Sequence, residues 1–183
     1  MSKYINNIKL TRFKTFSEDI ALSILKIRND NNIRKNMIND HLIKLEDHIN
    51  WLKNNIIDEK NIFYIVYIKN KISGLIRFII NEDKAEWSFY LNKNSKNIYG
   101  AFVEYVAIEK IFELKKINQL ECQVLSFNNR VLSLHQKFGF RQNKIERQVL
   151  FREKKYVDLI HLINYKKLWI IEKEKIKNKL KIK

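Results

Sequence analysis

Residues 85–113 join a strand pattern to a helix pattern in a way that suits the binding of an anion. Aromatic and apolar residues predict a strand over Ala85–Leu91, polar residues predict a loop over Asn92–Tyr99, and helical spacing of apolar residues predicts a helix over Gly100–Glu113. Backbone N–H groups at the start of such a helix are unpaired and commonly bind phosphate groups. The stretch therefore predicts a phosphate site, and an ordinary strand, loop and helix without a ligand is the alternative.

The composition predicts one domain without disulfides. The chain has 183 residues, of which 45% are hydrophobic, enough for a substantial core. Its single cysteine, Cys122, excludes an internal disulfide and a cysteine-rich zinc site, and we expect no metal. The sequence has no signal-peptide pattern and no apolar run long enough to cross a bilayer. We therefore expect a cytoplasmic protein without a membrane span.

The net charge of +16 would suit a polyanionic partner such as nucleic acid. However, lysine, isoleucine and asparagine are abundant along the whole chain, which indicates a biased composition rather than a basic patch. The sequence has no recognisable groove-reading helix and no regular alternation of aromatic and basic residues. Nucleic acid is therefore not an expected partner.

The most basic segment is the tail, residues 166–183, which we interpret as a helix that follows a single domain over residues 1–165. A solvated terminal helix is the simplest interpretation. The tail could also lie on the protein, on an anionic surface or on a partner helix in a homodimer. One helical face would then carry the apolar residues Leu168, Ile171, Ile176 and Leu180.

Hydrophobic periodicity and turn residues predict the remaining elements. Thr15 and Glu18 form a capping-box pattern at the start of the first helix, and Gly139 follows the last helix of the domain. In chain order we predict a strand over 8–13, helices over 15–28 and 45–52, strands over 63–68, 72–80 and 85–91, a helix over 100–113, a strand over 120–125, a helix over 128–138 and a final hairpin of strands over 147–152 and 155–163. This order predicts an α/β or α+β fold.

Two stretches, together with this order of elements, resemble the GNAT acyltransferase family. Residues 128–140, with the sequence NNRVLSLHQKFGF, are similar to the family's helix motif N-x-x-a-x-x-l-Y-x-k-x-G-F. Residues 95–100 align with the family's pyrophosphate loop, R/Q-x-x-G-x-G/A, and keep only its last glycine. The resemblance implies a central mixed, mostly antiparallel sheet flanked by helices. It also implies acetyl-CoA as the cosubstrate that donates the acetyl group.

The resemblance assigns roles to residues that would bind acetyl-CoA. It implies that Asn128 contacts the pantetheine arm and that His135 stands where the family usually has a tyrosine near the thioester sulfur. A backbone N–H near Tyr90 or Leu91 is the expected donor to the oxyanion. Phosphate is expected at the backbone N–H groups of Asn97, Ile98, Tyr99, Gly100 and Ala101.

The N-terminal half narrows the resemblance. Short runs around Arg28, Met37 and His48, together with Ala85-Glu86-Trp87, resemble the sugar-nucleotide N-acetyltransferases of pseudaminic acid biosynthesis. Those enzymes acetylate the 4-amino group of UDP-4-amino-4,6-dideoxy-N-acetyl-β-L-altrosamine, which implies a UDP-aminosugar as the small-molecule partner. Arginine suits a diphosphate because it forms bidentate contacts. The residues expected to contact this substrate are Arg28, Asn29, Met37, His48 and Arg77.

Acetyl transfer from a thioester to an amine requires a neutral amine, a stabilised oxyanion and a proton for the departing thiolate. His135 is the candidate general acid because imidazole titrates near ~6.5, and simple packing at the helix surface is the alternative. Glu86 is the candidate base or amine-orienting group, since a carboxylate in an aromatic strand is partly desolvated. An outward-facing Glu86 on an alternating strand is the alternative.

Two other functions remain open from the sequence. The same chemistry could act on a protein N-terminus or another small amine instead of a sugar nucleotide. A protein of a different class, a basic module that binds nucleic acid or a surface, would lose binding steeply with salt and would not turn over acetyl-CoA.

Overall fold

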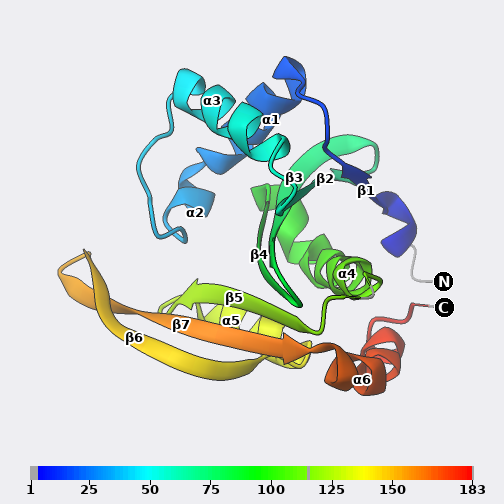
Figure 1. The fold of residues 1–183 in the computed structure, drawn as a ribbon. Coiled ribbons are helices and arrows are strands. Elements are labelled where there is room, and N and C mark those ends of the chain that lie inside the picture. Colours follow the sequence, from blue (N-terminus) through cyan, green and yellow to red (C-terminus); the bar gives the residue numbers. More distant parts are fainter. Residues whose placement is uncertain (1–3, 115, 183) are drawn as a thin grey trace.

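The chain folds into a mixed β-sheet with helices on both faces (Figure 1). The computed structural model describes residues 4–114 and 116–182. Its strands are β1 (Ile8–Arg12), β2 (Asn61–Ile68), β3 (Lys71–Asn81), β4 (Lys84–Leu91), β5 (Gln119–Leu125), β6 (Arg141–Arg152) and β7 (Lys155–Tyr165). Its helices are the 3₁₀ helix η1 (Ile5–Asn7), α1 (Glu18–Arg28), α2 (Asn31–Arg34), α3 (Leu45–Ile56), α4 (Lys93–Phe112), α5 (Asn129–Lys137) and α6 (Lys166–Lys179).

The sheet order is β1-β2-β3-β4-β5-β7-β6. Neighbouring strands are antiparallel except β4 and β5, which are parallel. The parallel pairing covers only Lys84–Glu86 against Gln119–Glu121, and beyond these residues the two strands diverge (Figure 1). This arrangement confirms the expected mixed, mostly antiparallel sheet.

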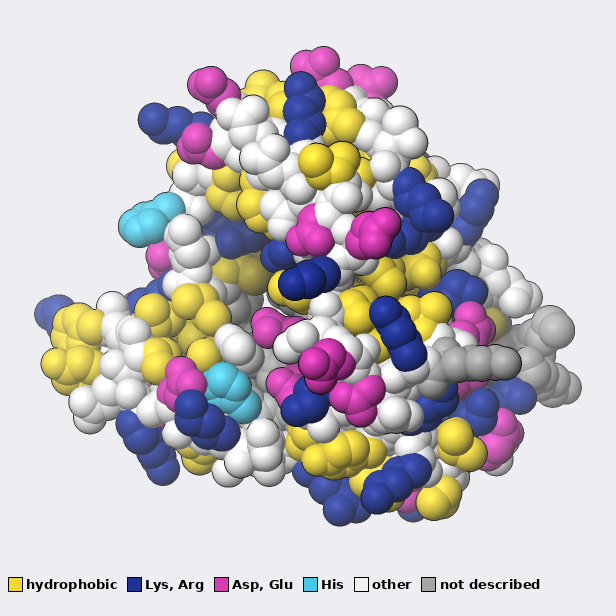
Figure 2. Space-filling model, viewed as in Figure 1, with side chains coloured by type: hydrophobic (Ala, Val, Ile, Leu, Met, Phe, Trp, Pro, Cys, Tyr) yellow, Lys and Arg dark blue, Asp and Glu magenta, His cyan; other side chains and the backbone are white. Residues whose placement is uncertain are grey.

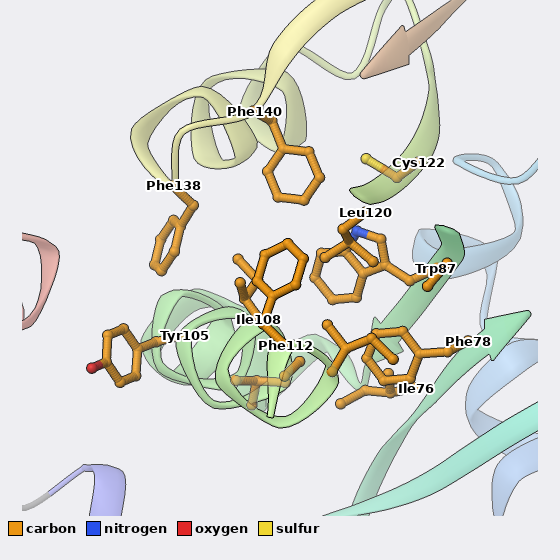
Figure 3. Packing of buried hydrophobic residues seen from close by; sticks show 14 of the residues in the cluster. Ile76, Phe78, Trp87, Tyr105, Ile108, Phe112, Leu120, Cys122, Phe138 and Phe140 are labelled. Carbon is orange, nitrogen blue, oxygen red and sulfur yellow. The ribbon is translucent and has the colours of Figure 1, made fainter. Parts of the chain in front are cut away.

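Each face of the sheet has its own core. On one face, α1 and α3 cover a cluster that includes Phe63, Ile65 and Leu75. On the other face, α4 and α5 cover the larger cluster, in which Trp87 stacks between Phe78 and Phe140 (Figure 3). The strands can serve two cores because successive side chains of a strand point to opposite faces.

The helix α4 begins at Lys93, so the predicted loop over Asn92–Tyr99 is wrong. Asn92 is the N-cap residue, and its side chain accepts a hydrogen bond from the Ser95 N–H at 2.9 Å. Ser95 and Tyr99 are both buried, so the inward-facing stripe of the helix starts one turn before the apolar run in the sequence. A polar capping residue and a buried serine hid this first turn from a hydrophobic pattern.

The starts of α1 and β6 also differ from the sequence prediction. The helix α1 begins at Glu18 with Ser17 as its N-cap and without a side-chain cap hydrogen bond, so the predicted capping box is wrong. The strand β6 begins at Arg141 rather than at Arg147, because the residues from Arg141 onward pair with β7 at the sheet edge. These first residues are mostly polar, so the apolar pattern did not reveal them. The predicted end of α5 is confirmed, since Gly139 follows with a φ of 87°.

The tail forms helix α6 and packs against the domain. Trp169 and Ile176 are buried, and the Trp169 ring stacks on Phe138 with centroids 6.4 Å apart. The predicted apolar face is partly wrong, because Ile176 is buried and Leu180 packs against the core but Ile171 is 73% exposed. Throughout the described ranges, no helix combines the length and the apolar character that a membrane crossing needs.

Candidate active site

The ring of His135 lies where β4 and β5 separate. Parallel pairing ends at Glu86 and Glu121, and the next residues of the two strands are Trp87 and Cys122. The imidazole of His135, on α5, packs edge-on against Trp87 with centroids 5.7 Å apart, and Cys122 is close enough to the same ring to affect its charge. Helix α5 thus places a titratable group at the start of the opening between the strands.

A carboxylate on α4 holds this imidazole from the other side. Glu104 Oε1 lies 2.7 Å from His135 Nδ1, and the two residues are 0% and 4% exposed. Burial alone would lower the pKa of His135, but the charge of Glu104 and the contact with Cys122 raise it to about 10. Burial raises the pKa of Glu104. The sequence prediction missed Glu104, because a glutamate inside an apolar helix pattern resembles a solvent-facing residue.

Glu86 lies on the opposite face of the sheet from Trp87 and is exposed. It neighbours Glu121 on β5, and the two carboxylates line a small pocket together with Gln123 and His161. The candidate acid and the candidate base are therefore on different faces. They can act on one bound molecule only across the opening between β4 and β5.

The residues predicted to bind phosphate lie inside α4. Asn97 is the fifth residue of this helix, so N–H groups from Asn97 to Ala101 are hydrogen-bonded within the helix. The backbone N–H groups that have no carbonyl partner within the helix are those at the start of α4. There the N–H of Asn92 donates to Ser73 and that of Ser95 donates to Asn92, which leaves the amides of Lys93 and Asn94 at the helix end.

The side chains of the predicted cosubstrate residues have different surroundings. Asn97 accepts a hydrogen bond from Arg130 of α5 at 2.6 Å, whereas Ile98 is exposed. The Tyr99 phenol accepts one from Asn7, and so points to the N-terminal segment. A Cβ atom added at Gly100 would meet no atom of the described residues within 4 Å, so there is room for a methyl group although Gly100 itself is buried.

Asn128 is the N-cap residue of α5, on the same side of the sheet as α4. Its carbonyl accepts from the N–H groups of Val131 and Leu132, while its side chain, as far as the described residues go, makes no cap hydrogen bond. Tyr90 and Leu91 end β4 next to α4. Desolvation raises the pKa of the Tyr90 phenol.

On the opposite face, Arg28 and Asn29 organise the segment between α2 and α3. Arg28 Nη2 donates to the Asn39 carbonyl at 2.8 Å, and within the described part of the chain its buried Nη1 has no partner. Desolvation lowers the pKa of Arg28, and the nearby Tyr90 opposes this shift. The Asn29 side chain pairs with both backbone groups of Ile43, which gives it a structural role.

His48 and Arg77 are held by their neighbours. His48 is buried and stacks near Trp51, and burial lowers its pKa, which keeps it neutral. Arg77 donates to Asn61 at 2.9 Å and to Asn55 at 2.8 Å, and its guanidinium lies over the Trp51 ring. These contacts fix Arg77 on the face covered by α3.

Arg152, which the sequence prediction did not single out, links the tip of the β6–β7 hairpin to the segment after α2. It donates to the carbonyls of Met37 at 2.7 Å and Ile38 at 2.6 Å, and it pairs with the carboxylate of Asp40 at 3.3 Å. The residues are more than a hundred positions apart in sequence, so no local pattern could reveal the contact. Figure 2 shows the surface hollowed between the part over α1–α3 and the part over β5–β7.

The side chains that commonly bind metal ions are dispersed in the part of the chain that the structure describes. There, no three His, Cys, Asp or Glu side chains are grouped so that they could hold a metal ion.

Comparison with known proteins agrees with this geometry. Residues 15–161 match the family described as acetyltransferase (GNAT) domain. Acetyltransferase PseH of Campylobacter jejuni subsp. jejuni serotype O:23/36 (strain 81-176) is 29% identical over 134 residues, which cover 73% of this chain and 84% of that protein. PseH of serotype O:2 (strain ATCC 700819 / NCTC 11168) is 26% identical with the same coverage.

Solved structures share the fold at low sequence identity. The spermidine N-acetyltransferase from Vibrio cholerae, in complex with CoA and spermine, gives a TM-score of 0.81 at 15% identity and covers 90% of this chain and 99% of that one. The ribosomal-protein-alanine N-acetyltransferase from Brucella melitensis gives a TM-score of 0.69 at 20% identity. The match covers 86% of this chain and 98% of that one. The chain belongs to the GNAT acetyltransferase family and is an acetyl-CoA-dependent N-acetyltransferase.

Proposed function

We propose that this enzyme transfers the acetyl group of acetyl-CoA directly to the 4-amino group of a UDP-linked 4-amino-4,6-dideoxy sugar. The observation that carries the transfer step is the position of His135 at the point where β4 and β5 separate, beside Trp87 and Cys122. The acceptor class is supported by the similarity to acetyltransferases named PseH and by the sequence resemblance described above.

The pantetheine arm enters between β4 and β5 from the side of α4 and α5. The side chain of Asn128, which makes no cap hydrogen bond within the described residues, binds the arm. The space left by the absent side chain at Gly100 lets the cosubstrate approach α4 closely. The pyrophosphate binds at the start of α4, where the amides of Lys93 and Asn94 and the positive end of the helix dipole favour an anion.

The oxyanion is stabilised by a backbone amide of β4. The Asn92 N–H donates to Ser73 of β3, and amides alternate in direction along a strand. By this alternation the Tyr90 amide points to β3, whereas the Leu91 amide points to the side of β5, where the thioester enters. Leu91 is therefore the better donor of the two candidates.

The reaction needs no enzyme nucleophile. The neutral amine attacks the thioester carbonyl, the C–S bond breaks as the tetrahedral intermediate collapses, and the protonated imidazole of His135 gives its proton to the departing sulfur. Glu86 accepts a proton from the amine or orients it from the acceptor face. The products are the N-acetylated acceptor and free CoA.

The acceptor occupies the face covered by α1 and α3. The buried Nη1 of Arg28, which lacks a partner among the described residues, offers a donor to the diphosphate. His48 and Met37 come from the elements that enclose the same face. Arg77 supports the aromatic wall there through its contacts with the rings of Trp51 and Phe63.

One observation favours a second acceptor class. Glu86 and Glu121 lie side by side on the acceptor face, and two neighbouring carboxylates attract a cationic amine. A polyamine or a protein N-terminus would use this pair.

The test is release of free CoA from acetyl-CoA with purified enzyme and a matched panel: UDP-4-amino-4,6-dideoxy sugars, peptide N-termini and polyamines. We expect rapid turnover with one sugar nucleotide only, and loss of about 10²-fold or more in kcat for His135→Ala, the usual range for removal of a general acid. If a polyamine or a peptide were the preferred substrate, the proposed acceptor would be wrong, whereas the proposed acetyl-transfer step would stand.

A further inference from the structure

The position of Glu104 calls for a role that packing does not provide. It lies in the interior of α4 among buried apolar residues and is 0% exposed. A carboxylate in such a place is unfavourable unless its charge is compensated, and an apolar side chain of similar size would fit such a core at no such cost. Its Oε2 atom has no hydrogen-bond partner among the described residues, so the carboxylate is only half satisfied.

The geometry of the pair fixes the orientation of the imidazole. Oε1 of Glu104 forms a hydrogen bond with Nδ1 of His135 at 2.7 Å, which leaves Nε2 as the ring nitrogen for any other partner. The β4 side chains that face the ring, Trp87 and Phe89, are uncharged, as is Phe140. Cys122 of β5 is the other titratable neighbour and also favours the charged ring, and Glu104 is the carboxylate that contacts the ring.

We propose that Glu104 is a positioning residue that keeps His135 protonated at Nε2, ready to give that proton to the CoA thiolate. This inference rests on the proposed function, in which His135 is the acid. During the transfer, the Nε2–H bond breaks and the S–H bond forms, while Nδ1–H stays on the ring and donates to Glu104. The proton that the amine loses to solvent or to Glu86 is the one that restores His135 after the products leave.

The electrostatics of the site support this role. Burial opposes a charged imidazole, yet the pKa of His135 is raised to about 10, and the charge of Glu104 is the largest single cause that raises it. Without the charge of Glu104, burial would oppose the charged ring with only Cys122 against it, and we expect the pKa of the imidazole to fall to its ordinary range or below. A neutral imidazole with its only proton at Nδ1 has none to give at Nε2.

The test compares Glu104→Gln with wild type and with Glu113→Gln. The glutamine side chain at position 104 would keep the size and an oxygen acceptor but lose the charge. Glu113 is the exposed C-cap residue that follows α4, and among the described residues its carboxylate pairs with Lys110, so it is a matched control. The measurements are kcat and KM from pH 6 to 10, and the ¹⁵N NMR signals of His135 without substrates.

For Glu104→Gln we expect a neutral His135 at pH 8 and a loss of about 30-fold in kcat there, the fraction lost when the pKa falls back to ~6.5. The loss should shrink towards pH 6, and KM for acetyl-CoA should change little. Wild type and Glu113→Gln should keep both ring nitrogens protonated at pH 8. The NMR signals also show whether the variant is folded.

A parallel variant, His135→Gln, distinguishes the failure of this inference from the failure of the proposed function. If His135→Gln loses activity while Glu104→Gln keeps the wild-type pH profile and a protonated imidazole, the role of Glu104 is overturned and that of His135 stands. If His135→Gln keeps full kcat, the imidazole is not the acid and both proposals fall.

Discussion

At the scale of single residues, His135 shows two opposing effects on one proton. Burial in a core of Trp87 and Phe140 disfavours the charged ring, whereas the carboxylate of Glu104 favours it. The raised pKa means that the carboxylate prevails. The ordinary pKa of imidazole, which made His135 a candidate in the sequence, therefore underestimates how firmly the folded protein holds this proton.

This balance predicts a pH dependence of stability. The pKa of His135 is higher in the folded protein, at about 10, than its ordinary value, so its stabilising contribution is complete below about pH 6.5 and is lost as the pH rises through about 10. We expect the free energy of unfolding in urea to fall between pH 7 and pH 10 by an amount on the order of a few kcal/mol. Burial also raises the pKa of Glu104, and a raised carboxyl pKa lowers the free energy of unfolding as the pH rises through it, so Glu104 does not offset this fall.

The variant His135→Gln should flatten that part of the profile. An unchanged slope between pH 7 and pH 10 in this variant would mean that other groups cause the pH dependence and that the ion pair contributes little.

At the scale of elements, α4 carries a capping side chain at its start and a glycine in its interior. Gly100 lies in the middle of the helix, where glycine is less favourable than alanine by ~0.5–1 kcal/mol. We expect Gly100→Ala to raise the melting temperature, since an added Cβ meets nothing. The same methyl group should raise KM for acetyl-CoA, because it occupies the surface that the cosubstrate approaches.

Gly139→Ala is the contrasting variant. Its φ of 87° disfavours any side chain, so this substitution should lower the melting temperature. If Gly100→Ala left KM for acetyl-CoA unchanged, the cosubstrate would not pass close to α4 at this point.

The β6–β7 hairpin is joined to the acceptor face by Arg152. Its guanidinium donates to backbone carbonyls after α2 and pairs with Asp40. We expect Arg152→Ala to raise KM for the acceptor about 10-fold, since lost hydrogen bonds from a charged group are worth ~1.5–3 kcal/mol. KM for acetyl-CoA should stay the same, because that molecule enters from the other face.

Arg147→Ala is the matched control, since Arg147 is an exposed arginine of the same strand and pairs with Asp158. Equal effects of the two variants on both substrates would show that the contact of Arg152 only stabilises the hairpin.

At the scale of the whole molecule, the tail belongs to the core. The buried side of α6 places Trp169 between Tyr105 and Phe138, and its indole N–H donates to Glu109 at 2.5 Å. We expect Trp169→Ala to lower the free energy of unfolding by ~3–5 kcal/mol in urea titrations. Ile171→Ala should change it by no more than ~0.5 kcal/mol, because Ile171 is exposed. Equal effects would contradict the packing of this helix.

The order of strands and helices was predictable because their apolar residues repeat with clear periods. The capped first turn of α4 and the polar edge strand β6 were not, since polar residues make both of them and give no hydrophobic pattern. His135 was found through a motif that spans a single helix. Glu104 and Arg152 were missed because each acquires its partner only when distant segments fold together.

The most direct test of the account is a crystal structure of the enzyme with CoA. We predict that the sulfur lies between β4 and β5, next to the Nε2 atom of His135, with the pyrophosphate at the start of α4. A sulfur atom outside this opening, or one separated from His135 by the packed ring of Trp87, would contradict the role of His135 as the proton donor.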